Sequence, residues 1–261
     1  MSIYVGVGGW VYPEWRDNFY PTGLPQKREL EYASAHLTAI EINGTYYGSQ
    51  KPESFRRWHD ETPRGFVFTV KGPRFATNRR VLAEAGGSIE KFFASGVTEL
   101  KEKLGAVNWQ FMATKKFDPT DFEAFLKLLP KKVNGLAIRH AVEVRHDSFK
   151  DKAFVELCRK HGVAIVFGAD SDFPLIADVT ADFIYARIMG TQAKQQLGYP
   201  PATLKKWAQR AQAWEKGEEP KKLPLLAAAA PKKKRDVFLF VISGAKERNP
   251  AAAQAIIAAL P

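Results

Sequence analysis

The sequence of 261 residues lacks most of the residues from which proteins build disulfides and thiolate metal sites. Cys158 is the only cysteine, so the chain can form neither an internal disulfide nor a site with two thiolate ligands. No apolar run reaches about 18 residues, which argues against a membrane-spanning helix. Residues 1–6 have neither the basic nor the apolar region of a signal peptide. We therefore expect a cytoplasmic protein that makes no membrane contact.

Acidic residues are scarce relative to basic ones, with 28 Asp and Glu against 39 Lys and Arg and a formal net charge of +11. The excess is concentrated in residues 205–235, which hold ten Lys and Arg but only three Glu. Within this stretch, residues 216–235 are predicted to form a long basic surface connector before the last strand. The basic stretch is either a solvated surface segment or a contact region for nucleic acid or another polyanion.

Apolar runs of strand length recur along the whole chain and alternate with helical patterns. Strands are predicted over residues 3–9, 39–43, 66–71, 107–111, 141–145, 164–168, 183–188 and 237–242. Helices are predicted over residues 28–37, 52–61, 88–104, 121–129, 152–161, 202–215 and 250–260.

This alternation predicts an α/β protein, a single (β/α)8 barrel of the TIM type that spans residues 1–261. Asp and Pro residues after the sixth strand predict that the barrel is irregular there, with at most a short helix. A doubly wound open sheet is the alternative. It would favour a glycine-rich phosphate loop after the first strand, and Gly6-x-Gly8-Gly9-Trp10 does not match that motif.

Polar side chains stand at the ends of several predicted strands. Successive side chains of a strand point to opposite faces, so Glu41 and Asn43 share one face while Ile40 and Ile42 share the other. In a (β/α)8 barrel the carboxyl ends of the strands form the active-site face. The same reasoning brings further residues to this mouth, namely Lys71, Gln110, Glu143, Arg145 and Arg187.

Bare charges in such a space would cost several kcal/mol, so they must be paired, hydrated or bound to a ligand. One interpretation is a self-satisfied network, for example Glu143 with Arg187 and Glu41 with Lys71. The other is a pocket for a small anionic or sugar-like ligand. The candidate catalytic residues are Glu41, Glu143 and Lys71. The candidate substrate-binding residues are Trp10, Asn43, Tyr46, Gln110, Arg145 and Arg187.

Histidine is too rare near the predicted mouth to build a zinc site, because only His146 follows a strand end. We predict no metal and no cofactor, although an oxygen-ligand magnesium site of Glu41, Glu143 and Asp170 stays open as an alternative. Aromatic residues follow the first strand, at Trp10, Tyr12, Trp15, Phe19 and Tyr20. They either close and pack the barrel or form a stacking wall for a sugar or base.

Together these residues resemble the YecE-like family, known as domain of unknown function 72. The resemblance rests on Gly9-Trp10-x-Tyr12-x-x-Trp15, Glu41-Ile42-Asn43-x-x-Tyr46, Phe68-x-Val70-Lys71, Glu143-x-Arg145 and Tyr185-x-Arg187. It implies a (β/α)8 barrel, distantly similar to endonuclease IV and sugar isomerases, and it implies no established activity. The chain departs from the family pattern at Asn78, where relatives often carry His, and at Ser243, where they tend to have an Asn-rich end. Such departures would alter ligand binding or mark a loss of activity.

Our leading hypothesis is a metal-independent barrel enzyme that uses acid/base carboxylates and a Lys/Arg anion clamp on a small anionic or polyhydroxylated substrate. The first alternative is a nucleic-acid-binding protein that uses residues 205–235 and aromatic stacking. The second is a non-catalytic barrel. The sequence predicts no oligomeric state.

Overall fold

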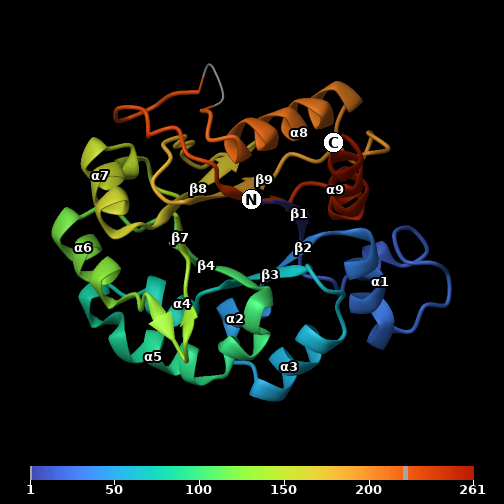
Figure 1. The fold of residues 1–261 in the computed structure, drawn as a ribbon, viewed down its shortest axis with the longest axis horizontal. Helices are drawn as coiled ribbons and strands as arrows, with labels where there is room; N and C mark the ends of the chain where they lie inside the picture. Colours follow the sequence, from blue (N-terminus) through green and yellow to red (C-terminus); the bar gives the residue numbers. More distant parts are fainter. Residues whose placement is uncertain (1, 220–222) are drawn as a thin grey trace.

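The computed structural model describes residues 2–219 and 223–261. In this part of the chain, eight strands form a closed barrel (Figure 1). They are β1 (Ile3–Gly8), β2 (Ala39–Ile42), β3 (Val67–Lys71), β4 (Leu104–Gln110), β7 (His140–Glu143), β8 (Ala164–Ala169), β9 (Phe183–Ile188) and β10 (Asp236–Val241). All neighbouring pairs are parallel, in the order β1-β10-β9-β8-β7-β4-β3-β2. The predicted (β/α)8 barrel is confirmed, and the open sheet is excluded.

Helices surround the barrel (Figure 1). The longer ones are α1 (Glu29–His36), α3 (Pro52–Asp60), α5 (Gly86–Ala94), α6 (Pro119–Leu128), α7 (Lys152–His161), α8 (Pro201–Glu215) and α9 (Asn249–Ala258). Two short helices, α2 (Gly44–Tyr47) and α4 (Arg74–Thr77), directly follow β2 and the loop after β3. Short 3-10 segments cover Pro13–Trp15, Gln26–Arg28, Leu82–Ala85, Val97–Lys103, Asp147–Phe149 and Lys246–Arg248. A small hairpin of β5 (Lys132–Val133) and β6 (Leu136–Ala137) precedes β7.

The predicted helix over residues 88–104 is wrong in its second half. Helix α5 ends at Ala94, and Gly96 has a left-handed φ of 95° that breaks the helix. A Cβ at Gly96 would also lie 2.8 Å from the ring of Pro52, so the close approach of α3 requires glycine. The chain continues as a 3-10 segment, and β4 begins at Leu104, earlier than predicted.

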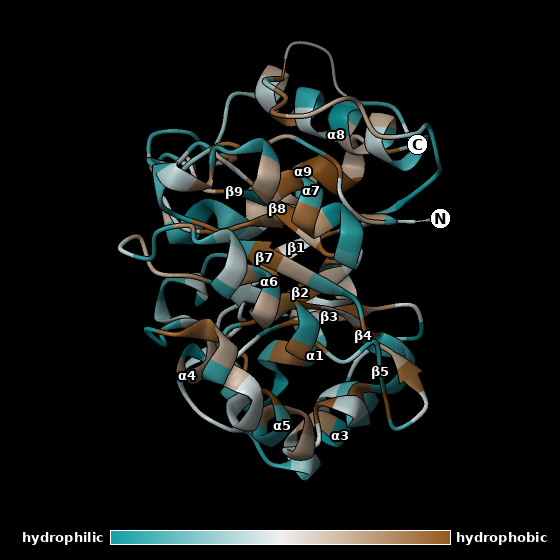
Figure 2. Cartoon of the chain, turned by 90° about the vertical axis from the view of Figure 1, so that its left-hand side faces the viewer, coloured by the Kyte–Doolittle hydropathy of each residue, from teal (hydrophilic) through white to brown (hydrophobic). Residues whose placement is uncertain are grey.

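The alternation of each strand divides the apolar residues into two layers. Ile40, Trp109 and Leu239 belong to the layer between the barrel and its helices, whereas Phe183 and Phe238 fill the lumen. Figure 2 shows hydrophobic residues concentrated on the strands and hydrophilic ones on the outer sides of the helices. The aromatic residues fill the lumen toward the amino ends of the strands, which leaves the opposite end of the barrel for polar side chains.

Two predicted irregularities occur at and after β8. Residues 170–182 are all described and contain no helix, so the barrel is irregular after its sixth strand as expected. The described residues of the basic connector, 216–219 and 223–235, connect α8 to the start of β10, so they lie at the amino end of the strands, opposite the mouth. Lys221 and Lys222, which belong to the predicted connector, lie outside the described residues.

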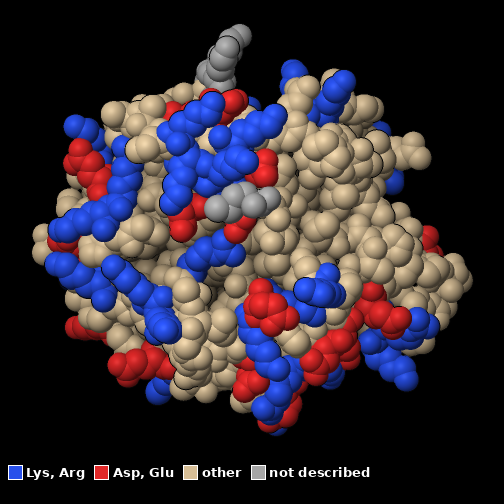
Figure 3. Space-filling view, viewed as in Figure 1, with Lys and Arg blue, Asp and Glu red and all other residues tan. Residues whose placement is uncertain are grey.

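The described part of the connector is anchored to the barrel. The backbone N–H groups of Leu226 and Ala227 each donate to the buried Asp178 carboxylate at 2.9 Å. Arg235 is buried and donates to the carbonyls of Ala181 and Pro231. Lys232, Lys233 and Lys234 remain exposed. Figure 3, seen from the side where the N-terminus lies, shows Lys and Arg gathered mainly on its left half.

Candidate functional site

Three charged side chains meet inside the barrel near the carboxyl ends of the strands. Glu41 of β2, Glu143 of β7 and Arg187 of β9 lie on the lumen faces of their strands, and they are 0%, 3% and 4% exposed. The Arg187 guanidinium lies between the two carboxylates. Its Nη2 donates to Glu41 Oε1 at 3.0 Å, and its Nη1 donates to Glu143 Oε2. The predicted pairing of Glu143 with Arg187 is therefore confirmed.

The remaining carboxylate oxygens also accept hydrogen bonds. The hydroxyl of Tyr185 donates to Glu41 Oε2 at 2.5 Å. Arg145 donates from Nε and Nη2 to Glu143 Oε1 at 2.9 Å and 2.7 Å. Asn108 Nδ2 lies 3.4 Å from Oε2 of both glutamates. All four oxygens are thus satisfied, which is the condition under which buried carboxylates stay charged.

Five charged side chains form what we call the buried charge cluster: Glu41, Lys71, Glu143, Arg145 and Arg187. The Lys71 ammonium donates to Gln110 Oε1 at 2.7 Å, and no ion pair joins Lys71 to Glu41 among the described residues. The predicted Glu41–Lys71 pair is wrong because the strand register places Thr69, and not Lys71, beside Glu41. Lys71 lies one layer closer to the opening.

Sequence reasoning missed two polar lumen residues as members of the site, Asn108 and Tyr185. They lie one layer deeper than Gln110 and Arg187, on the same faces of β4 and β9. The Tyr185 hydroxyl also contacts Thr69 Oγ1 at 2.8 Å, which ties β3 to β9 across the lumen. The alternation in the sequence already places Tyr185 on the face of Arg187, and extending it two residues back from Gln110 would have identified Asn108.

Burial and neighbouring charges shift the pKa values of Glu143, Lys71 and Arg187. Burial alone would raise the pKa of Glu143, but the charges of Arg187, Arg145 and Lys71 outweigh it and lower this pKa to about 2. Burial lowers the pKa of Lys71 to about 8, with help from Arg187 and against the pull of Glu41 and Glu143. For Arg187 burial is outweighed by the two carboxylates, which raise its pKa. Three cations against two carboxylates leave the cluster with excess positive charge.

The predicted rim residues lie next to the cluster. Trp10 and Asn43 line a groove of about 330 Å³ together with Tyr12. Asn43 Oδ1 is buried and has no partner within the described part of the chain. Tyr46 places its ring centre 5.6 Å from Lys71 Nζ. The structure therefore brings every predicted site residue to the mouth or its rim.

The aromatic residues after β1 have two different roles. Trp15 and Tyr20 are 1% exposed and pack in the core, as the packing interpretation predicts. The hydroxyl of Tyr20 donates to the carbonyl of Trp10 at 2.6 Å and fixes the loop that carries it. Trp10 is half-buried and lines the groove with Tyr12 and Trp58, so these side chains can offer an aromatic surface to a ligand there.

Three other residues singled out in the sequence lie away from the cluster. Asp170 is exposed and accepts a hydrogen bond from Tyr199 at 3.0 Å, and among the described residues it forms no metal-ligating group with Glu41 and Glu143. Ser243 is exposed, and its carbonyl accepts from Thr191 at 3.1 Å. Asn78 lines a separate cavity.

Across residues 2–219 and 223–261, no group of three or more His, Cys, Asp or Glu side chains is arranged to hold a metal ion. No helix described here is long and apolar enough to cross a membrane.

Comparison with known proteins agrees with this architecture. The model of the family described as "Protein of unknown function DUF72" matches residues 4–261. The UPF0759 protein YecE of Escherichia coli K12 is 29% identical over 164 residues, which cover 62% of this chain and 55% of that protein. The match therefore spans about half the length of this relative.

Solved structures share the fold. A crystal structure of a DUF72 family protein from Thermotoga maritima MSB8 has a TM-score of 0.71 and 21% identity, over 98% of this chain and 97% of that chain. The crystal structure of SacUVDE has a TM-score of 0.55 and 10% identity, over 99% of this chain and 97% of that chain. At such identities the likeness shows the barrel architecture alone.

Proposed function

The chain belongs to the protein family of unknown function DUF72, and we propose that its barrel mouth is a metal-independent site for proton transfer on a small anionic or polyhydroxylated molecule. Lys71 and Arg145 contact the anion in this proposal, and Lys71 also exchanges the proton. Glu41 and Glu143 hold the two arginines in position. Trp10, with the rim groups described above, orients the rest of the ligand.

The excess positive charge of the buried charge cluster carries the proposal. Arg187 directs Nη1 and Nη2 to its two carboxylates, and its Nε is buried without a hydrogen-bond partner in the described part of the chain. Lys71 donates to one amide oxygen although its ammonium has three N–H groups. Arg145 uses Nε and Nη2 for Glu143, and its side chain is 22% exposed. The cations nearest the opening therefore have donors to spare, and an anion would balance a charge that burial makes costly.

Lys71 suits proton transfer better than the two carboxylates do. A pKa of about 8 leaves both the ammonium and the free amine populated near neutral pH. Glu143, with a pKa of about 2, is held as an anion by its arginine partners and is a weak base. The acid/base role that the sequence predicts for Glu41 and Glu143 stays a prediction, and it would require either residue to leave its partners during the reaction.

Thermal unfolding in the presence of inorganic phosphate and of a sugar phosphate tests the proposal. A ligand that binds only the folded state raises the Tm by mass action. We expect such a rise in the wild-type protein and its loss in Lys71→Met, which keeps the length of the side chain but removes the charge. Lys232→Met, at the other end of the barrel, is the matched control. An equal rise in the wild type and Lys71→Met would contradict the proposal.

Nucleic-acid binding is the second candidate, and the exposed Lys232, Lys233 and Lys234 favour it. The connector and the aromatic rim lie at opposite ends of the barrel, so they cannot form the single surface that the sequence hypothesis combines. Binding through residues 205–235 would rest on phosphate contacts alone. It predicts an affinity for a short DNA duplex that falls steeply with salt, and salt-independent binding would contradict it.

A further inference from the structure

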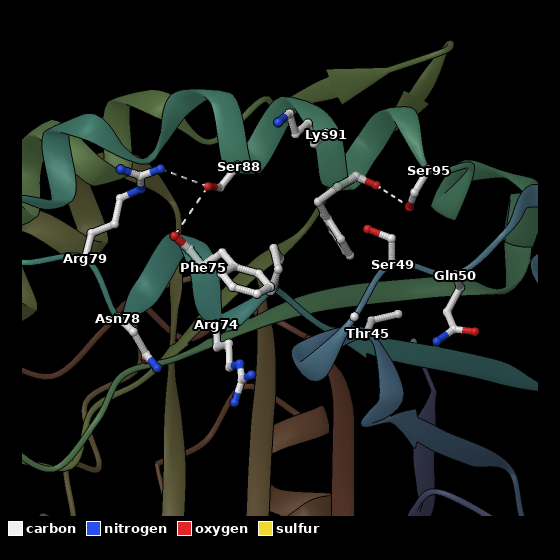
Figure 4. A pocket seen from close by; sticks show the side chains of 13 residues that line it. Thr45, Ser49, Gln50, Arg74, Phe75, Asn78, Arg79, Ser88, Lys91 and Ser95 are labelled. Carbon is white, nitrogen blue, oxygen red and sulfur yellow. Dashed lines mark hydrogen bonds between the residues drawn. The ribbon is translucent and has the colours of Figure 1, made fainter.

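A cavity of about 680 Å³ lies beside the mouth, between α2, α4 and α5 (Figure 4). Arg74, Arg79 and Lys91 bring three positive charges to its wall, and no described Asp or Glu lines it. Thr45 belongs to the wall on the mouth side, where its hydroxyl donates to the carbonyl of Lys71 at 2.7 Å. The cavity therefore adjoins the mouth but has positive charges of its own.

The positive charge on this wall is only partly compensated. The exposed carboxylate of Glu84 lies 4.0 Å from Arg79 Nη1, and Arg79 Nη2 donates to Ser88 at 3.3 Å. Arg79 Nε and the neighbouring Asn78 Oδ1 are both buried and have no hydrogen-bond partner in residues 2–219 and 223–261. A buried polar atom without a partner destabilises the folded protein. An oxygen of an anionic ligand would supply the acceptor that Arg79 Nε lacks.

An aromatic surface accompanies these polar atoms. Phe75 is 60% exposed, and Figure 4 shows its ring projecting into the space between α5 and Ser49. The Arg74 guanidinium lies 5.6 Å from the centre of this ring. Phe92 adds a second, buried aromatic side chain to the lining. A large exposed apolar side chain beside a cavity is a typical contact for the apolar part of a ligand.

We propose that this cavity binds a small organic anion with a flat aromatic part, such as an aryl phosphate. Planar guanidinium groups match the oxygens of a phosphate or carboxylate, and a stacked ring next to Arg74 gains both apolar and cation–π contact. The volume lies within the range of about 300–1,000 Å³ that is usual for small-molecule sites. The site is separate from the buried charge cluster, and the proposal does not depend on the function assigned to the mouth.

Titration calorimetry with phenyl phosphate, inorganic phosphate and phenol tests the proposal. Phenyl phosphate should bind at least about tenfold more tightly than either fragment, because only it engages the cations and the aromatic surface together. Benzoate should bind more weakly than phenyl phosphate if the dianionic charge matters, and equal affinity would assign the site to carboxylates. The absence of saturable phenyl phosphate binding up to about 10 mM would overturn the proposal.

Matched variants locate the binding. The double variant Arg74→Gln, Lys91→Gln should weaken phenyl phosphate binding by about tenfold or more, and Phe75→Ser should abolish its advantage over inorganic phosphate. All three side chains are exposed, so the fold should persist, which circular dichroism checks. Lys232→Gln controls for the loss of a surface charge. Binding that survives the double variant but disappears in Lys71→Met would place the anion in the mouth and overturn the cavity site.

Discussion

The two ends of the barrel both carry excess positive charge, but they hold it in opposite ways. At the mouth, Arg187 and Glu143 are almost fully buried and joined by a hydrogen bond. At the amino end, the Lys232 side chain is 71% exposed and its ammonium lies 3.3 Å from a Glu218 carboxylate oxygen. Water and salt screen the second kind of charge, whereas the first depends entirely on its partners.

The difference shows that net charge by itself does not locate a site. Most of the sequence's excess charge lies in residues 205–235, yet most of the charged side chains that the structure describes there are exposed to solvent. Burial of a titratable group does not locate a functional site either. His140 is buried near the amino end with a pKa lowered to about 4 by burial, but its ring is committed to the Pro130 carbonyl and the Trp109 indole. The mouth differs from His140 because it combines buried charge with hydrogen-bond donors that have no partner among the described residues.

Removing Arg187, the central cation of the mouth, should have the largest effect on stability. Arg187→Met leaves two buried carboxylates without their shared partner, and we expect it to lower the free energy of unfolding by about 3–5 kcal/mol. Lys232→Met should change it by no more than about 0.5 kcal/mol. Urea denaturation measures both. Comparable effects at the two ends would show that the cluster is solvated and not buried.

Low pH should reduce the stability that the buried charge cluster contributes at the mouth. Because the pKa of Glu143 is about 2 in the folded protein and 4.5 ordinarily, the unfolded chain binds more protons between these values. The stabilisation is complete above pH 4.5 and is lost as the pH falls toward about 2, by about 3 kcal/mol in total. Urea denaturation between pH 6 and pH 3 measures the slope. The slope should be smaller in Glu143→Gln, and an unchanged slope would assign it to other groups.

Anion binding at the mouth should depend on the charge of Lys71. With a pKa of about 8, the ammonium is protonated below this pH and neutral above it. Phosphate affinity should therefore fall as the pH rises through about 8, by about tenfold per pH unit beyond it. Lys71→Arg should shift this loss to higher pH, because arginine stays protonated. A wild-type affinity that is constant from pH 7 to pH 9 would contradict the role of Lys71.

The exposed lysines at the amino end should affect salt-dependent binding and have little effect on stability. Replacing Lys232, Lys233 and Lys234 with Gln should leave the stability within about 0.5 kcal/mol of the wild type. If the connector contacts DNA, the same triple variant should lower the slope of log affinity against log salt by about 3. Fluorescence anisotropy with a labelled duplex measures the slope. An unchanged slope would remove the connector from any nucleic-acid contact.

Local patterns in the sequence were enough for the architecture. The spacing of apolar runs predicted all eight barrel strands, and α7 over residues 152–161 was predicted to the residue. Prediction failed where a long-range contact decided the outcome. The helix over 88–104 looked continuous, but Gly96 turns there because α3 packs against it through Pro52.

The candidate site shows the same division. The alternation of strand side chains placed Glu41, Glu143 and Arg187 in the lumen, because side-chain direction in a strand follows from backbone geometry alone. The partner of Lys71 could not be predicted in this way. It depends on the register between β2 and β3, which puts Thr69 beside Glu41 and leaves Lys71 to Gln110.

The sequence by itself thus determined which residues face the lumen and that eight strands would close around them. Only the tertiary structure decided which charges meet, that the cavity beside α5 forms, and that the basic connector lies at the far end. The reason is physical. The direction in which a side chain points depends on neighbouring residues along one strand. Which charged side chains form a pair depends on distances across the barrel, and those distances are fixed only when all the strands have closed in register.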